Sequence, residues 1–160
     1  MKGKPQRVTR YGKEAVGIVA ENEWLARTRP APTRRRTGAR PGARDRAANA
    51  RRAARAGRAF ARLVGVMATL RSAHGCPWDR QQTHASLRPF LLEETYEALD
   101  AIDRGDLDDL RGEVGDVLFQ CVFHSQLAAE SGAFDAGDAL QAVVAKLVRR
   151  HPHVFTAGGR

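Results

Sequence analysis

Five acidic residues in the C-terminal half of the chain are spaced so that they could do chemistry together. Glu93, Glu94 and Glu97 lie in the stretch FLLEETYEALDAI, and Glu113 and Asp116 follow in DLDDLRGEVGD. Residues three apart occupy neighbouring positions on one helix face, so the acids form one ExxE pair and one ExxD pair. Like charges one turn apart destabilise a helix by about a few tenths of a kcal/mol per pair, so a positive partner is expected.

Gly105 marks a turn between the two segments that carry these acids. Glu97 and Glu113 lie equally far from Gly105 on its two sides, and so do Glu94 and Asp116, one turn further away. In an antiparallel helical hairpin, equal distances from the turn correspond to equal depth along the helices. We therefore expect Glu97 to face Glu113 and Glu94 to face Asp116.

Four converging carboxylates would form an all-oxygen ligand set, which suits Mg²⁺, with Mn²⁺ as a substitute. Mg²⁺ usually keeps waters or binds substrate phosphates instead of accepting a cage made only of protein, so such a site indicates phosphate chemistry. ExxE and ExxD pairs are also common on solvated helix faces, and spacing alone leaves that interpretation open. A di-iron site is disfavoured because no Glu in the chain has a His three residues later.

Hydrophobic periodicity predicts an all-α fold, with no convincing strand pattern. Gly105 and Ser131-Gly132 end helices, Asp106 fits an N-cap, and Pro89 is placed in a first turn. The predicted helices cover residues 60–74, 87–103, 106–130, and 135 or 138 to 150, with a loop over 75–86.

Apolar residues at helical spacing predict which faces of two helices are buried. On the helix from residue 106, Glu113 borders the apolar face. The predicted buried residues are Phe60, Leu63, Val64, Met67 and Leu70 on the first helix, and Val114, Val117, Leu118, Cys121 and Val122 on the third.

The basic character of the chain belongs to its N-terminal part. Residues 1–60 hold 17 Lys and Arg against 4 Asp and Glu, whereas residues 61–160 hold 10 against 14. Residues 1–58 are rich in Arg, Ala, Pro and Gly and poor in large apolar side chains, which predicts a disordered arm. Helix could begin at about Ala47, since Ala and Arg favour helix.

Three interpretations of this arm compete. It could bind nucleic acid through phosphates, it could be a solvated tail, or it could be an upstream extension from a mis-assigned start codon. The last two together are favoured. No aromatic residue interrupts the basic run of residues 27–58, which argues against stacking on single strands.

The other chemistry-bearing residues give weaker signals. Cys76 and Cys121 lack CxxC spacing, so a reduced, cytoplasmic protein is expected, and no run of apolar residues is long enough to predict a membrane span. Trp78 is expected to pack against the protein and Cys76 to be structural. His84, His124, His151 and His153 do not form a ligand set by spacing.

The ordered combination of GCPWD, the EExxE and ExxD acids and RRHPHVF resembles the MazG family of nucleoside triphosphate pyrophosphohydrolases. The resemblance covers about residues 60–155 and gives the domain boundaries 1–58 for the arm and 59–160 for the helical domain. It implies an antiparallel helical bundle completed by a homodimer. It also implies Mg²⁺-dependent hydrolysis of a nucleoside triphosphate to the monophosphate and pyrophosphate.

The same resemblance assigns roles to individual residues. Glu94, Glu97, Glu113 and Asp116 match the family's metal ligands, and Glu93 matches a further catalytic acid that could hold a second metal or orient the attacking water. Without the resemblance, the two basic residues at the end of the last helix could equally serve its C-terminal dipole. With it, Lys146 and Arg150 match residues that contact the triphosphate.

The chain departs from longer family members in ending soon after RRHPHVF and in having one copy of the domain. Nucleotide recognition therefore stays open although the metal site is whole. Two alternatives to the hydrolase remain: a non-catalytic dimerisation or regulatory module, and a nucleic-acid-binding protein that acts through the basic arm.

Overall fold

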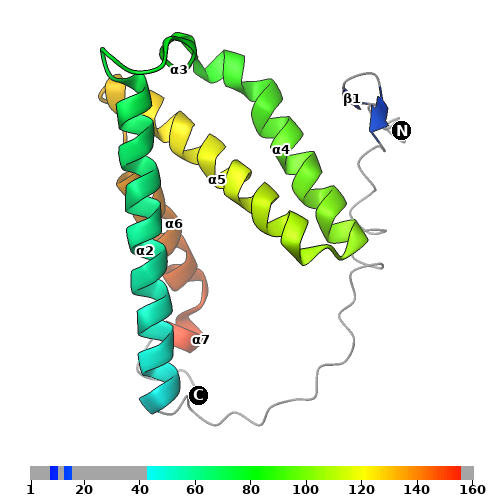
Figure 1. The fold of residues 1–160 in the computed structure, drawn as a ribbon. Coiled ribbons are helices and arrows are strands. Elements are labelled where there is room, and N and C mark those ends of the chain that lie inside the picture. Colours follow the sequence, from blue (N-terminus) through cyan, green and yellow to red (C-terminus); the bar gives the residue numbers. More distant parts are fainter. Residues whose placement is uncertain (1–7, 11–12, 16–42, 156–160) are drawn as a thin grey trace, which may run out of the picture. The chain divides into compact units, whose positions relative to one another are not determined.

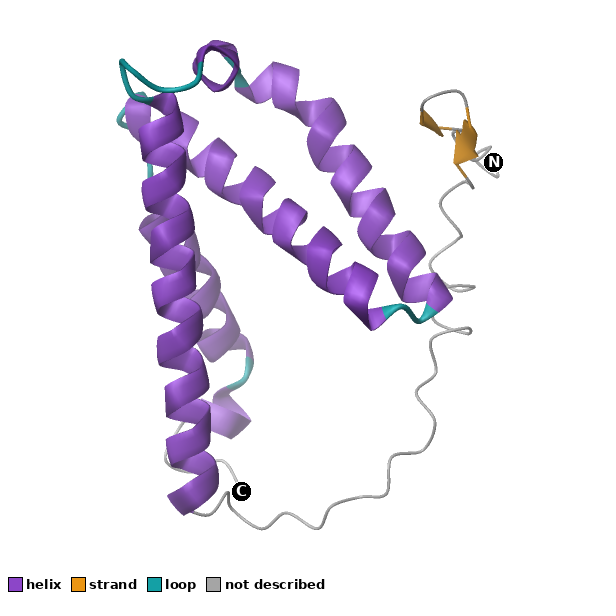
Figure 2. Ribbon diagram, viewed as in Figure 1, coloured by secondary structure: helices purple, strands orange, loops and turns teal. Residues whose placement is uncertain are grey.

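The structure is a computed structural model that describes residues 8–10, 13–15 and 43–155. The chain divides into two units, Met1–Ala48 and Asn49–Arg160. Figure 1 follows the elements along the sequence, and Figure 2 distinguishes helices from strands and loops. In chain order they are β1 (Val8–Arg10), β2 (Lys13–Ala15), α2 (Ala43–Arg71), α3 (Pro77–Gln81), α4 (His84–Arg104), α5 (Leu107–Glu130), α6 (Ala136–Arg150) and α7 (Pro152–Phe155).

The first unit contains two short strands that the sequence did not predict. β1 and β2 pair antiparallel, with Val8 opposite Ala15 and Arg10 opposite Lys13. Strands of three residues are too short for an alternating pattern to be recognised, which explains why they were missed. From residue 43 onward every described element is helical, so the all-α prediction is confirmed there.

Helix α2 begins earlier than expected. It starts at Ala43, whereas helix was predicted from about Ala47 and disorder up to residue 58. The expected disorder therefore does not extend to residues 43–58, where Ala and Arg give high helix propensity and no proline interrupts the segment. The rest of the expected arm, apart from β1 and β2, lies outside the described residues.

The core forms where α2, α4 and α5 meet. Met67 of α2, Leu87 of α4 and Phe123 of α5 are almost completely inaccessible to solvent. The predicted buried face of the first helix is confirmed, since all its other members pack against this core. The partly buried residues around it are Phe60, Leu63, Val64, Leu70, Phe90, Phe119 and Leu127.

A tight connection joins α2 to the short helix α3, in a region predicted as loop. The Cys76 N–H donates to the Leu70 carbonyl at 2.8 Å, and a Cβ on Gly75 would lie 2.1 Å from the Leu70 oxygen. Only glycine fits this approach. Trp78 of α3 meets the ring of Phe90 edge to face at 5.8 Å, as expected of a residue that packs against the protein.

Helix α4 starts three residues before its predicted start. Thr83 caps it, with its side chain accepting from the Ser86 N–H while the Ser86 side chain accepts from the Thr83 N–H. Pro89 consequently lies in the second turn, not the first. There its missing N–H removes a hydrogen bond to the Ala85 carbonyl.

The turn between α4 and α5 forms as predicted. Gly105 has a φ of 68°, in the left-handed region that glycine adopts cheaply. The Asp106 side chain caps α5 by accepting from the N–H groups of Asp108 and Asp109 at 3.1 and 3.0 Å. The two helices run antiparallel from this turn, as Figure 1 shows, and pack along each other.

The buried face of α5 differs from the prediction. Val122 is buried as expected, but Val114 and Leu118 are 46% and 44% exposed and Cys121 is also exposed. The difference arises because α2 and α4 cover another side of α5, towards its C-terminal end. The buried residues of α5 are Gln120, Val122, Phe123, Ser125 and Ala128.

Arg71, at the end of α2, connects this helix to α3 and α5 at the edge of the core. Its guanidinium donates to both carboxylate oxygens of Glu130, at 2.8 and 2.6 Å, and also to the carbonyls of Asp79 and Gln82. The hydrogen bond from Arg71 lowers the pKa of Glu130, and the same bond raises the pKa of Arg71. One side chain thus joins the ends of α2 and α5 to α3.

Asp135 is the N-cap of helix α6 and forms a capping box with Asp138, and the helix ends before His151 as predicted. All its residues after Ala136 are exposed. Its large apolar residues recur at helical spacing and form an uncovered face, which is Leu140, Val143, Val144, Leu147 and Val148. No helix among the described residues combines the length and apolar character needed to cross a membrane.

Candidate metal centre

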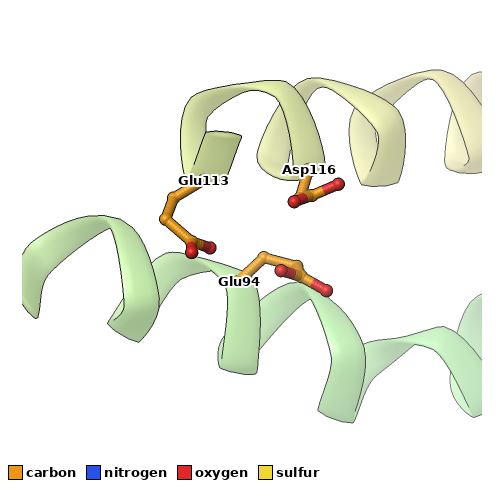
Figure 3. Close-up of side chains that lie close together, drawn as sticks. All are labelled: Glu94, Glu113 and Asp116. Atoms are coloured by element: carbon orange, nitrogen blue, oxygen red, sulfur yellow. The ribbon is translucent and has the colours of Figure 1, made fainter. Parts of the chain in front are cut away.

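Three of the predicted ligands come together between α4 and α5. Glu94 of α4 and Glu113 and Asp116 of α5 each offer a carboxylate oxygen, and these oxygens all lie within 4.8 Å of one another. Figure 3 shows the three side chains projecting into the space between the two helices. The hairpin therefore brings acids from the two sides of the Gly105 turn to one place.

The burial of these acids makes their proximity costly. Glu94 and Glu113 are half-buried, Asp116 is exposed, and Oε2 of Glu113 is buried with no hydrogen-bond partner among the described residues. Two unit charges 4 Å apart repel by about 4 kcal/mol at the effective dielectric constant of about 20 found near protein surfaces. A buried carboxylate oxygen without a donor, facing two more carboxylates, fits a bound cation.

The donor set indicates which cation fits. All three groups are carboxylates, which suit Mg²⁺ or Mn²⁺ better than softer metals that prefer Cys or His. Three protein oxygens also leave room for waters or substrate oxygens, as Mg²⁺ sites usually require.

The predicted facing pairs are only partly found. Glu94 lies with Asp116 as expected, but Glu113 also joins Glu94, and Glu97 is not part of the group. Glu97 lies on α4 about one turn beyond Glu94, nearer to the Gly105 end of the hairpin. Glu93 and Glu97 are both half-buried on α4.

The two predicted basic residues lie on another helix. Lys146 and Arg150 are exposed on α6, which has only limited contact with α5 and α7. No ion pair joins either of them to an acid among the described residues. Within one chain, the structure does not bring these cations to the carboxylates.

The structure also brings together two histidines whose spacing in the sequence did not indicate a shared ligand set. The Nδ1 atoms of His84 and His124 lie 2.9 Å apart, the ring centroids 5.2 Å apart, and the ring planes differ by 4°. The distance between the ring centroids exceeds the Nδ1–Nδ1 distance by about the sum of the two ring radii. The two Nδ1 atoms therefore lie on the line that joins the centroids and point at each other. The rings therefore lie edge to edge and share a hydrogen bond.

His124 is the more enclosed member of this pair. Its Nε2 atom is buried and lacks a hydrogen-bond partner among the described residues. In the shared hydrogen bond one Nδ1 atom donates and the other accepts. Burial, and secondarily repulsion from His84, lower the pKa of His124. Counting from Gly105 would have revealed this pair, since the two histidines lie at nearly equal distances from it along the chain.

Comparisons with known proteins indicate one family. The MazG nucleotide pyrophosphohydrolase domain matches residues 82–155. The chain is 59% identical over 95 residues to a nucleoside triphosphate pyrophosphohydrolase of Escherichia coli K12, covering 59% of this chain and 36% of that protein. It is 54% identical over 100 residues to the nucleoside triphosphate pyrophosphohydrolase/pyrophosphatase MazG of Thermotoga maritima, covering 62% of this chain and 39% of that protein. The chain thus spans little more than a third of the length of these relatives.

The fold also matches a solved structure. A crystal structure of a mazG-related protein from Thermotoga maritima superposes with a TM-score of 0.52 at 30% identity, covering 60% of this chain and 82% of that one. The match to the family's domain includes the whole α4–α5 hairpin with its carboxylates. On these grounds, the chain belongs to the MazG family.

Proposed function

We propose that this chain hydrolyses nucleoside triphosphates to the nucleoside monophosphate and pyrophosphate in a Mg²⁺-dependent reaction. The observation that carries the proposal is the group of three carboxylates, with its unpartnered Glu113 oxygen, inside the domain shared with the pyrophosphohydrolases. The free Cys76 and Cys121 are compatible with work in the reducing cytoplasm.

Glu94, Glu113 and Asp116 would hold the ion, and Glu97 would complete the set by turning its side chain towards them from the next turn of α4. Mn²⁺ could replace Mg²⁺ on the same oxygens. When bound, the ion would neutralise phosphate charge and polarise a water molecule. Without it, the three carboxylates would repel a triphosphate.

Glu93 would act on the attacking water. Its neighbour Glu94 projects towards α5, and consecutive residues of a helix do not share a face, so Glu93 would approach the reacting centre from a different direction. A carboxylate there can orient the water and accept its proton. A second metal ion held by Glu93 is the alternative use of this acid.

Lys146 and Arg150 would bind the phosphates on the pyrophosphate side. They stand at i and i+4 on α6, so both cations project from one face, and Arg can form two parallel hydrogen bonds to a phosphate. Because they are not near the carboxylates in a single chain, we propose that a homodimer brings them to the partner's acids. The uncovered apolar face of α6, next to these cations, supports an interface at this helix.

Pyrophosphate release from a panel of nucleoside triphosphates, with and without Mg²⁺, tests the proposal. Glu113→Gln keeps the size of the side chain but removes a ligand. It should cost more than the about 10- to 100-fold that is typical for groups that only orient metal ligands. Asp103→Asn, an exposed acid near the end of the same helix as Glu94, is the matched control and should retain full activity.

Two outcomes would refute the proposal. Unchanged turnover in Glu113→Gln would remove the metal assignment. Absence of hydrolysis with every nucleotide, in a protein that is folded and dimeric by light scattering, would instead identify a non-catalytic module of the family. A Leu147→Asp variant tests the interface separately, because it should give monomers and lose activity while the α4–α5 hairpin still binds Mn²⁺.

A further inference from the structure

Four arginines form one face of α2, outside the candidate metal centre. Arg51, Arg55, Arg58 and Arg62 follow one another at steps of four, three and four residues, which keeps them on a single side of a helix. All four side chains are exposed. At about 1.5 Å per residue, this arginine face is about 16 Å long.

Within the part of the chain that the structure describes, no acidic group pairs with the arginine face. The sequence contains no Asp or Glu between Asp45 and Asp79. None of the four guanidinium groups forms an ion pair among the described residues. Each neighbouring pair of like charges costs the helix about a few tenths of a kcal/mol. The face therefore carries four uncompensated charges at a small cost in stability.

The arginine face is not needed for packing. The core residues of α2 begin at Phe60 and continue through Leu70, and no residue from Arg44 to Ala59 is buried. By helical periodicity, Phe60 and Met67 lie more than a quarter turn from Arg55 and Arg62 around the axis. The four guanidinium groups consequently point away from the core, on a side of α2 that remains accessible to solvent.

We propose that the arginine face binds the phosphate backbone of double-stranded nucleic acid. A duplex presents one negative charge per about 1.7 Å of its axis, so a row about 16 Å long lies beside about nine charges, of which its four arginines can contact about four. Such contacts fix position without reading bases. This activity would be separate from the proposed hydrolysis, because the face shares no residue with the metal centre or α6.

Two other anionic partners fit the face less well. Single strands are usually held by aromatic residues between the cations, and α2 has none from Ala43 to Ala59. Anionic membranes are bound by helices with large apolar residues beside the basic ones, and the same stretch has only Ala and Gly as apolar residues.

Fluorescence anisotropy with the full chain and DNA and RNA duplexes of two helical turns, at several salt concentrations, tests the proposal. Four phosphate contacts predict that log K falls against log salt with a slope of about −3.6. Affinity should therefore drop about 100-fold between about 50 and 200 mM salt. A slope near zero, or binding to single strands that is tighter than binding to either duplex, would overturn the proposal.

A pair of double variants separates the face from net charge. Arg58→Gln with Arg62→Gln removes two charges from the face and should reduce the slope by about 1.8, since each contact contributes about 0.9. Arg104→Gln with Arg111→Gln removes the same charge from arginines that already pair with Asp109 and Asp108, and should leave binding unchanged. Gln favours helix, and circular dichroism checks that α2 is intact.

Three results would count against the proposal. Equal losses in the two double variants would mean that only net charge matters. Tighter binding to phosphatidylserine vesicles than to duplexes would indicate a membrane partner. Self-association that disappears with Arg58→Gln and Arg62→Gln would indicate that the acidic half of a second copy covers the face. Nucleotide hydrolysis should be the same in both double variants as in the wild type, so this test does not depend on the proposed function.

Discussion

Both the carboxylates of the α4–α5 hairpin and the arginine face of α2 concentrate charges of one sign, but they do so in different ways. The acids converge from two helices until their oxygens lie within 4.8 Å, and one oxygen is buried without a partner among the described residues. The arginines spread along one exposed helix, with their side chains in water. Convergence with burial suits a single small ion, whereas a solvated row suits a polymer with regularly spaced charges. Arrangement, more than charge, indicates the partner.

The largest expected effect separates the converged acids from ordinary surface acids. In metal-free protein, Glu113→Gln should raise the unfolding temperature, because it removes a charge that repels a neighbour about 4 Å away by up to about 4 kcal/mol at the effective dielectric constant found near protein surfaces. Mg²⁺ should then stabilise the wild type and leave the variant unchanged, since a bound ion stabilises only the form that holds it. Thermal unfolding with and without Mg²⁺ measures both effects.

Asp103→Asn is the control for this comparison. Its side chain is exposed near the end of α4, so its stability with and without Mg²⁺ should follow the wild type to within about a few tenths of a kcal/mol. A Mg²⁺ response in Glu113→Gln equal to that of the wild type would show that the three carboxylates do not bind the ion.

The next largest effect compares a buried, paired arginine with the exposed ones. Arg71→Met should lower the free energy of unfolding by about 2–3 kcal/mol, because Glu130 and two carbonyls lose a charged donor. Arg58→Gln should change it by less than about 0.5 kcal/mol. Urea unfolding of both variants measures the difference, and equal values would contradict the role assigned to Arg71.

A smaller effect depends on pH. An unfolded histidine titrates at about 6.5, and the pKa of His124 in the folded protein is lower, so the unfolded state takes up a proton first as pH falls. The contribution of His124 to stability is therefore fully present above about pH 6.5 and is lost as pH falls through its lowered pKa. Unfolding temperatures at a series of pH values from neutral to mildly acidic measure this loss.

His124→Phe should reduce this dependence on pH, since it removes the titrating group. His153→Phe, a change at an exposed histidine of α7, should retain it. Wild-type dependence in His124→Phe would show that the burial of His124 does not control the effect.

The smallest effect tests whether the arginine row strains its own helix. Arg55 has Arg51 one turn before it and Arg58 one turn after it. Arg55→Gln should therefore stabilise the protein by about a few tenths of a kcal/mol at low salt and by nothing at high salt, where the repulsion is screened. Urea unfolding at the two salt concentrations shows whether this difference exists.

Local signals predicted the frame of the hairpin well. Gly105 in the left-handed conformation and Asp106 as the cap of α5 were both predicted, because a turn and an N-cap depend on the residues that form them. Counting residues from that turn also predicted that Glu94 lies beside Asp116. It did not predict that Glu113 joins them while Glu97 lies outside the group, since helix rotation and side-chain conformation decide which of the two reaches it.

What the sequence did not predict depends on neighbours distant in the chain. Val114 and Leu118 have the periodicity of a buried face, yet they stay exposed because α2 and α4 cover the opposite side of α5. The contact between His84 and His124 joins residues forty apart, and only their similar distances from Gly105 indicate it, not the residues around either histidine. Burial and pairing of this kind are decided by packing, which periodicity alone does not specify.

The capped turn at Gly105 has a consequence for how the site assembles. Glu94 and Asp116 belong to one hairpin and are joined by a short stretch of chain, and a loop of this size closes at a low entropic cost that grows slowly with length. Contacts between residues so near in sequence form early in folding compared with long-range ones. The acids can therefore meet as the hairpin closes, before the distant end of α2 docks, and an ion captured at that stage would favour the native register.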